Sequence, residues 1–265
     1  MIRFFSRSAV PHPDDLCLVH TPLPGTPAFR FCEDGWWGPR RVLPMGDQPG
    51  LFLGEAEGRP LWAIEAPAVD GEVWTSLRPL MAEAPADLVK AAVRAAELAA
   101  WRRDHQYCGA CGTPTRRRED QVVFECPSCG TEFWPRVTPA VIMLVHRGNE
   151  VLLARNARFR ATPIHSCLAG FVEAGETLEE AVAREVEEEV GVVVGQPRYI
   201  GSQAWPFPHA LMAGFFAPWV SGEPVPDGVE IIEAGWYHKG NLPSLPPPLS
   251  IARNLIRTFF DDPGL

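Results

Sequence analysis

The chain has 265 residues, of which 46% are hydrophobic and 22% charged, enough to bury the core of one large domain or of two. Its formal net charge of -9 excludes a protein that holds nucleic acid mainly by neutralising phosphates, although a local pocket could still bind the end of an RNA. No apolar run reaches the ~18 residues of a membrane span, and the start MIRFFSRSAV is too polar for a secretory signal, so we expect a cytoplasmic protein.

Three segments follow one another along the chain. Residues 1–104 begin with short apolar runs between Gly and Pro, which predict strands, and end with an Ala-rich stretch, 85–104, of helical periodicity. Residues 105–135 contain paired cysteines. Residues 136–265 begin with two apolar runs around a turn, predicted as paired strands, and end with a helix after Ser250. We therefore expect a β-rich N-terminal α+β domain, a cysteine unit and a larger C-terminal domain.

Four of the seven cysteines lie in two CxxC pairs separated by 14 residues: Cys108, Cys111, Cys126 and Cys129. Four thiolates at this spacing suit a tetrahedral Zn²⁺ ion, and the glycine after each pair lets the backbone turn. A redox dithiol is the alternative, but two pairs with trailing glycines favour a zinc ribbon. Because all four ligands would come from the protein, we expect a structural metal and not a catalytic one.

The segment Gly170–Val192 has eight glutamates among its 23 residues. Thr177, followed three residues later by Glu180, forms a capping box, which marks the beginning of a helix. Gly191 is a typical residue after a helix end. The sequence therefore predicts a glutamate-rich helix over residues 178–190.

Three carboxylates of this helix, Glu185, Glu188 and Glu189, fall within one narrow arc at about 100° per residue, in line with the apolar residues of its first turns. They therefore extend the edge of the buried face, where water is scarce and like charges repel most strongly. A hard divalent cation such as Mg²⁺ offsets this repulsion, because it takes oxygen ligands from few carboxylates and completes its shell with water and substrate phosphates. The alternative is that Arg184 and other cations neutralise the acids.

The glutamate-rich segment resembles the Nudix box, GX5EX7REUXEEXGU with U a bulky aliphatic residue, at every specified position from Gly170 to Val192. Resemblance to Nudix hydrolases implies the α/β class, with an α/β/α sandwich for residues 136–265. It also implies hydrolysis of a nucleoside diphosphate linked to another group, with Mg²⁺ or Mn²⁺ as cofactor.

The resemblance further implies roles for individual residues. The implied catalytic acids are Glu185, Glu188 and Glu189, one of which, Glu189 before the others, activates the water. The implied ligands of the catalytic metal are the carbonyl of Ala169 and the carboxylates of Glu185, Glu189 and Glu230. Glu233 is the competing choice for Glu230.

A second stretch narrows the resemblance. Residues 202–212 read SQAWPFPHALM and are similar to the SQPWPFPxS-type motif that follows the box in NADH pyrophosphatases, the NudC-like subfamily. Ala204 and Ala210 replace the usual Pro and the usual Ser or Thr. That subfamily also has a four-cysteine zinc ribbon before the Nudix domain and an extra N-terminal domain. It implies NADH, NAD⁺ and RNA with a 5′ NAD cap as substrates, giving NMN, oxidised or reduced, with AMP or 5′-monophosphate RNA.

A nicotinamide pocket and a homodimer are implied as well. Phe171 and Trp134 are expected to sandwich the flat nicotinamide ring, with Trp134 donated by the partner subunit. Gln121, with Glu119 nearby, occupies the place of a family acid on the ribbon hairpin. The other expected substrate contacts are Arg78, Gln203, Ala204, Trp205, Pro206, Phe207, Pro208, His209, Ala210 and Ala252.

Three other functions stay open at this point. The chain could hydrolyse ADP-ribose, diadenosine polyphosphates or other dinucleotides in preference to NADH. It could be a zinc-ribbon RNA-binding module that uses Arg116, Arg117 and Arg118 on the ribbon hairpin, although a solvated turn is the plainer interpretation of that run. It could also be a Nudix scaffold without activity, against which the intact box argues.

Overall fold

The computed structural model describes residues 86–118, 121–159 and 162–261, together with residues 77 and 81 and six strand segments nearer the N-terminus. Side chains are described at 77, 81, 86, 89–118, 121–158 and 162–261. The chain divides into two compact units, 1–136 and 137–265, and each is described by itself. Within the described ranges no helix is both long and apolar enough to cross a bilayer.

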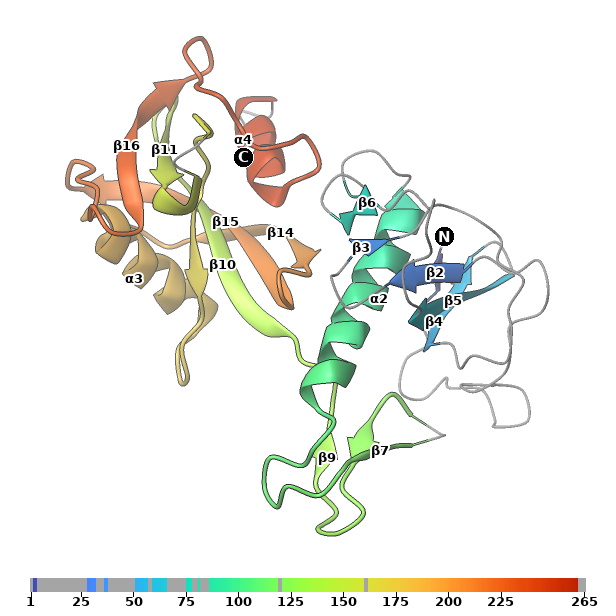
Figure 1. The fold of residues 1–265 in the computed structure, drawn as a ribbon. Coiled ribbons are helices and arrows are strands. Elements are labelled where there is room, and N and C mark those ends of the chain that lie inside the picture. Colours follow the sequence, from blue (N-terminus) through green and yellow to red (C-terminus); the bar gives the residue numbers. More distant parts are fainter. Residues whose placement is uncertain are drawn as a thin grey trace. The chain divides into compact units, whose positions relative to one another are not determined.

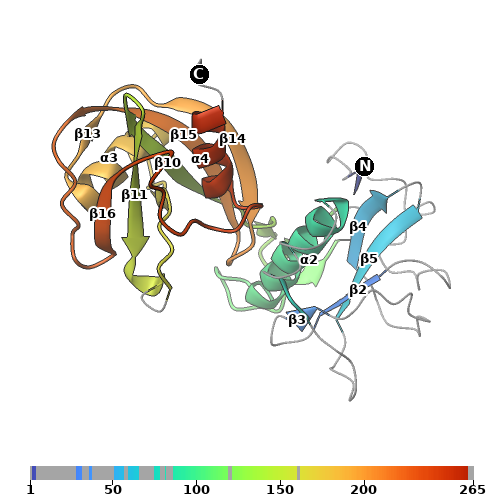
Figure 2. The ribbon, with the colours of Figure 1, turned by 90° about the horizontal axis from the view of Figure 1, so that it is seen from above.

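The six described strands that precede helix α2 (Ala86–Asp104) in the first unit form one sheet in the order β1-β4-β5-β2-β3-β6 (Figure 1). Helix α2 lies against this sheet beside β4 (Figure 2). It buries small apolar side chains such as Ala91, Ala92 and Ala95, and the predicted helix is confirmed. The strands are β1 (Ile2–Arg3), β2 (Ala28–Phe31), β3 (Trp36–Trp37), β4 (Leu51–Ala56), β5 (Arg59–Glu65) and β6 (Thr75–Ser76).

A small three-stranded sheet follows α2 within the same unit. It consists of β7 (Arg116–Arg117), β8 (Phe124–Glu125) and β9 (Glu132–Phe133), which are antiparallel neighbours. The rings of Trp101, near the end of α2, and Phe124 lie 4.6 Å apart between centroids, so aromatic packing joins this sheet to the helix.

The second unit is built on a seven-stranded mixed sheet in the order β13-β15-β10-β11-β16, with β12 also paired to β10 and β14 to β15. β10 and β15 are parallel, and the other pairs are antiparallel. The strand pair predicted before the glutamate-rich helix is confirmed as the antiparallel pair of β10 and β11. The strands are β10 (Thr138–Arg147), β11 (Glu150–Asn156), β12 (Leu168–Phe171), β13 (Val193–Val194), β14 (Arg198–Trp205), β15 (Ala210–Ser221) and β16 (Ile231–His238).

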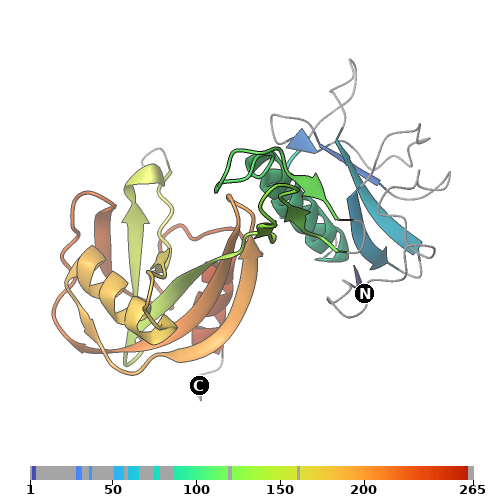
Figure 3. The same ribbon diagram turned by 90° about the horizontal axis from the view of Figure 1, so that it is seen from below.

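Both faces of this sheet are covered, which gives the predicted α/β/α sandwich. Helix α3 (Leu178–Val190) and helix α4 (Ile251–Asp261) lie on opposite sides of it (Figures 1 and 3). Alternate residues of a strand point to opposite faces. Accordingly β10 packs Val141, Met143 and Val145 beneath α3, whereas Ile142 and Leu144 pack beneath α4.

Helix α3 begins and ends where its capping residues predict. The Thr177 side chain accepts a hydrogen bond from the backbone N–H of Glu180, and the Glu180 carboxylate accepts one from the Thr177 N–H at 2.8 Å. Gly191 has a φ of 68°, in the left-handed region that glycine tolerates best, and its N–H donates to the Glu187 carbonyl. Thr177 side-chain capping contributes about 1 kcal/mol to helix stability.

Candidate active site and zinc ribbon

Strand β12 and helix α3 come close together at the beginning of the glutamate-rich segment. A Cβ atom on Gly170 would overlap the carboxylate of Glu185 on α3. Glycine at this position therefore lets a helix carboxylate lie directly against a strand backbone. This close approach explains why the first residue of the motif is a glycine.

Replacing Gly170 with alanine is expected to lower turnover by about 100-fold, because a displacement of a reacting group by about 1 Å has that effect. The added methyl group would take the space of the Glu185 carboxylate, which is the free end of a flexible side chain and can swing away. The melting temperature should therefore change little. Gly201→Ala is the matched control, because a Cβ there meets no atom within 4 Å. Unchanged turnover in Gly170→Ala would contradict this reading.

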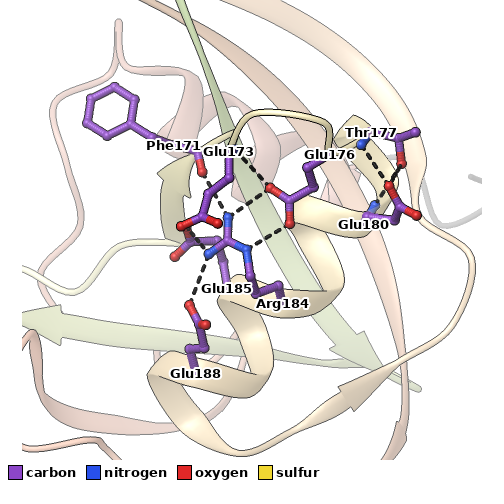
Figure 4. A network of polar contacts seen from close by, with 8 residues as sticks. All are labelled: Phe171, Glu173, Glu176, Thr177, Glu180, Arg184, Glu185 and Glu188. Atoms are coloured by element: carbon purple, nitrogen blue, oxygen red, sulfur yellow. Dashed lines mark hydrogen bonds and ion pairs between the residues drawn. The ribbon is translucent and has the colours of Figure 1, made fainter.

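One arginine organises several acids of the motif (Figure 4). The guanidinium of Arg184 donates to both carboxylate oxygens of Glu176, at 2.7 and 3.0 Å, and to Glu185 at 2.8 Å and Glu188 at 2.9 Å. It also donates to the backbone carbonyl of Phe171 at 2.9 Å, which ties α3 to the end of β12. The sequence did not predict that Glu176 binds Arg184. The two residues are eight positions apart and lie on either side of the helix start, so helical periodicity does not relate them.

Arg184 thus neutralises part of the cluster, as the alternative interpretation expected, but the hydrogen bonds of its guanidinium go to Glu176, Glu185, Glu188 and the Phe171 carbonyl and not to Glu189. The Glu189 side chain is only 6% exposed, and its Oε2 is buried without a hydrogen-bond partner. Burial, followed by the negative charges of Glu185 and Glu230, raises the pKa of Glu189 to about 8, although the Ala169 backbone N–H donates a hydrogen bond to it. An unpaired buried carboxylate beside other acids fits a site for a divalent cation.

The other predicted acids differ from one another in exposure and contacts. Burial raises the pKa of Glu185 despite the neighbouring Arg184. The Glu188 side chain is 61% exposed, so the prediction that it lies on the inner edge of the helix is wrong: it points about 100° away from the buried Glu189. Glu230 lies in the turn that precedes β16 and not in the strand itself.

Glu233, the competing choice for Glu230, faces the other side of the sheet. It forms an ion pair with Arg155 of β11, and its carboxylate lies 3.4 Å from the Nε2 atom of His165. In β16 it shares the parity of Tyr237, which packs beneath α4. Glu233 therefore pairs with Arg155 and His165 on the face opposite α3. Of the two candidate ligands, Glu230 is the one whose charge acts on Glu185 and Glu189.

The register of the sheet places two of the predicted substrate residues, Phe171 and Gln203, on the face opposite the acids of α3. Phe171 is opposite Ala140, which is opposite Met212, which in turn is opposite Gln203. Paired residues point to the same face, so Phe171 and Gln203 lie with Met212 on the α4 side. The Phe171 side chain is 53% exposed there and leaves a free aromatic face. Strand β12 thus contributes to both faces of the sheet: Gly170 lies beneath Glu185 on the α3 face, and Phe171 points to the α4 face.

The side-chain amide of Gln203 is occupied by contacts within the chain. Its Nε2 donates to the Leu249 carbonyl at 2.9 Å, and its Oε1 accepts from the Ile251 N–H at 2.7 Å. Gln203 therefore fastens the beginning of α4 to β14. The neighbouring Ala252 has a buried side chain, so a substrate contact at that position would use backbone atoms.

The rest of the motif forms the turn between β14 and β15. Trp205 and Phe207 are perpendicular rings with centroids 5.2 Å apart, and the bond between Phe207 and Pro208 is cis. His209 Nδ1 lies 2.9 Å from the Thr138 hydroxyl, which fixes the turn to the beginning of β10. Ala210 is buried, Ala204 and Pro208 are exposed, and Pro206 is buried. The turn presents parts of its two aromatic rings to solvent.

The remaining predicted contacts belong to the first unit. Arg78 and Glu119 lie outside the described residues. Gln121 lies in the bend before β8. The Trp134 side chain is 40% exposed, just after β9. As substrate contacts, these residues stay predictions.

The four paired cysteines come together at the tip of the three-stranded sheet. Sγ–Sγ distances are 3.6 Å between Cys108 and Cys129, 3.5 Å between Cys111 and Cys126, and 3.7 Å between Cys111 and Cys129. A tetrahedron with Zn–S bonds of about 2.3 Å has edges of about 3.8 Å, so the spacing fits one zinc ion. In the described part of the chain, this is the group whose ligand atoms all lie within 4.8 Å of one another.

Both halves of the cysteine site have the same backbone turn. The N–H of Gly112 donates to the Cys108 carbonyl and the N–H of Gly130 to the Cys126 carbonyl, at 2.8 and 2.9 Å. Their φ angles are 72° and 74°, so each turn requires the left-handed region that the trailing glycine supplies. Hydrogen bonds with Thr113 lower the pKa of Cys111 to about 6, which favours the thiolate that zinc binds.

The arginines of the ribbon hairpin do not form an open basic surface. Arg116 donates to Glu125 of β8 at 2.7 Å, and Arg118 donates to Glu132 of β9 at 2.8 Å. These ion pairs offset the positive charge that phosphate binding would need. The interpretation of the run as a solvated turn is wrong as well, because Arg116 and Arg117 form strand β7 and Arg117 and Arg118 are partly buried.

A seven-stranded mixed sheet between two helices, with the motif glycine beneath a helix carboxylate, defines a Nudix hydrolase. Residues 136–259 match the NUDIX domain model, and residues 103–133 match the NADH pyrophosphatase zinc ribbon domain. A crystal structure of a NUDIX hydrolase from Nitrosomonas europaea has the same fold, with a TM-score of 0.50 and 24% identity, covering 59% of this chain and 91% of that one.

Relatives that match most of the length of this chain indicate which family of Nudix hydrolases it belongs to. A protein of Stutzerimonas stutzeri named NAD-capped RNA hydrolase NudC is 46% identical over 226 residues, which cover 84% of this chain and 81% of the relative. A protein of the same name from Chromobacterium violaceum is 49% identical over 242 residues, covering 91% and 87%. The chain belongs to the NudC family of Nudix hydrolases.

Proposed function

We propose that this chain hydrolyses the pyrophosphate bond of NADH and NAD⁺, giving NMN(H) and AMP, and removes 5′ NAD caps from RNA. The observation that carries the proposal is the identity of 41–49% with relatives named NAD-capped RNA hydrolase NudC. An active scaffold is supported by the complete set of motif acids and by the buried, unpaired oxygen of Glu189.

In this proposal the acids beside α3 hold Mg²⁺ or Mn²⁺ through Glu185, Glu189, Glu230 and the Ala169 carbonyl. Such a cation, when bound, neutralises charge on the pyrophosphate oxygens. Glu189 accepts the proton of the attacking water, a role for which its buried Oε2, without a hydrogen-bond partner in the chain, is available. Arg184 keeps Glu185 and Glu188 in place, and the exposed Glu188 orients the water or shares the cation.

The nicotinamide end of the substrate is proposed to lie against the exposed ring of Phe171, with the turn from Gln203 to Ala210 as the wall of the pocket. Trp134, also partly exposed, would supply the second aromatic face from the partner subunit of a homodimer. A cytoplasmic location is proposed as well, because the five described cysteines form no disulfide and four of them are grouped as ligands for zinc, as expected of a reducing compartment.

The test is a comparison of substrates with purified protein and Mg²⁺ or Mn²⁺. NADH, NAD⁺, NAD-capped RNA, ADP-ribose and diadenosine polyphosphates are incubated separately, and NMN(H) and AMP release is followed. The proposal predicts higher rates for the NAD-containing substrates. Faster cleavage of ADP-ribose or a diadenosine compound would keep Nudix chemistry and reject the substrate, whereas salt-sensitive binding of uncapped RNA without hydrolysis would reject the enzyme.

A further inference from the structure

The segment between β15 and β16 is fastened to the C-terminal end of α3. The N–H of Val225 donates to the Val190 carbonyl at 2.9 Å, and the N–H of Asp227 donates to the Glu189 carbonyl at 3.1 Å. The last four carbonyls of a helix lack partners within the helix. This segment therefore satisfies two of them, one of which belongs to the buried acid itself.

The side chain of Asp227 then fixes the turn that carries Glu230. Its Oδ1 accepts from the N–H groups of Val229 at 3.2 Å, Glu230 at 3.1 Å and Ile231 at 2.7 Å, and its Oδ2 accepts from the Glu230 N–H at 3.1 Å. Gly228, with a φ of 76°, allows the sharp bend. On the other side of the turn, the Glu230 carbonyl accepts from the Ala157 N–H at 2.7 Å.

We propose that Asp227 is a positioning residue for the catalytic cation: through its own N–H it holds Glu189, and through its carboxylate it holds Glu230. The two acids come from different elements, a helix and a turn, and Asp227 is the residue that bonds to both at the backbone. This inference rests on the proposed function, in which Glu189 and Glu230 bind that cation.

Charge supports a role beyond that of a simple turn. Asp227 adds a negative charge near Glu189, and like charges oppose one another. An asparagine would keep one acceptor oxygen for these backbone N–H groups without this repulsion. A bound cation removes the repulsion, so the cost of an aspartate here is offset in the loaded site.

The experiment is a double-mutant cycle on the full-length protein with Mn²⁺ as the probe. Free Mn²⁺ is measured by electron paramagnetic resonance, and kcat and KM for NADH are measured at saturating Mn²⁺. Asp227→Ala and Glu230→Gln are each expected to weaken Mn²⁺ binding about tenfold, which is typical of a lost partner of a metal ligand. The double variant should be no weaker than Glu230→Gln alone, because the carboxylate of Asp227 acts through Glu230, whereas its backbone N–H, which bonds to the Glu189 carbonyl, is kept in every variant.

Asp227→Asn separates positioning from a general loss of structure. It retains an acceptor oxygen for the Ile231 and Glu230 N–H groups, so its Mn²⁺ affinity should stay within about threefold of wild type. At saturating Mn²⁺ the KM for NADH should not change in Asp227→Asn, and the melting temperature is recorded for every variant. If Asp227→Ala does not fold, Asp227→Ser replaces it in the cycle.

Two results would overturn the inference alone: wild-type Mn²⁺ affinity in Asp227→Ala while Glu230→Gln binds weakly, or effects that multiply to about 100-fold in the double variant. Wild-type affinity in Glu230→Gln would instead reject the proposed ligand set, and the inference with it. Hydrolysis of NADH by the wild-type protein is measured in parallel, so a wrong substrate is recognised independently of the metal data.

Discussion

Replacing Glu189 with glutamine is expected to lower turnover by at least ~100-fold, the usual loss when a general base is removed. The carboxylate is 6% exposed and its Oε2 has no hydrogen-bond partner, so it is available for a cation or a water proton. Glutamine has the same shape but offers no negative charge. The measurement is kcat for NADH at saturating Mg²⁺ or Mn²⁺.

The fold should survive this substitution, which makes the loss of turnover interpretable. Because burial raises the pKa of Glu189 from 4.5 to about 8, the folded state binds its proton more tightly than the unfolded state does. The metal-free protein therefore loses stability as the pH rises from about 4.5 to 8, and Glu189→Gln escapes this loss. Without added divalent cation at pH 8, the variant should melt at or above the wild-type temperature.

Glu187→Gln is the matched control, since Glu187 is an exposed glutamate of the same helix. It should keep wild-type turnover. Near-wild-type activity in Glu189→Gln would reject its assignment as base and as ligand. A lower melting temperature in the metal-free variant would show that the carboxylate is stabilised by contacts other than those described above.

Replacing Cys126 with serine is expected to remove most of the zinc, reducing it from about one ion per chain. Cys126 is 2% exposed, and its Sγ lies 3.5 Å from that of Cys111. A serine hydroxyl is a poor zinc ligand and is shorter than the thiol, so the variant keeps only three of the four thiolates that would hold the ion. Structural zinc sites supply folding free energy directly. Hydrogen exchange should therefore increase over residues 105–135, and metal analysis should show the loss.

The end of α2 should respond as well, because Trp101 packs against Phe124 of the ribbon. Cys167→Ser is the matched control: this cysteine is buried in the α4-side core, away from the paired cysteines in the sequence. It should retain a full equivalent of zinc and lose only packing stability. A full equivalent of zinc in Cys126→Ser would show that the tetrahedral assignment is wrong.

Local sequence signals determined several features of this protein. Thr177 and Gly191 placed both ends of α3, because capping hydrogen bonds and a positive φ depend on neighbouring residues alone. The glycines after the CxxC pairs likewise predicted turns that the structure contains, at Gly112 and Gly130. The nine specified positions of the box were sufficient to indicate the α/β/α sandwich, which the sheet and its two helices confirm.

Contacts between distant segments were decided only by the tertiary structure. Glu188 and Glu189 are consecutive and therefore point about 100° apart around the helix axis. Periodicity alone does not say which of the two is buried, and the structure has the Glu188 side chain 61% exposed and Glu189 6%. The position of Gly170 beneath Glu185 depends on strand register, and the amide of Gln203 is bonded to a helix start 48 residues later. Periodicity fixes an angle around an axis, whereas burial and pairing need the partner surface, which only the folded chain provides.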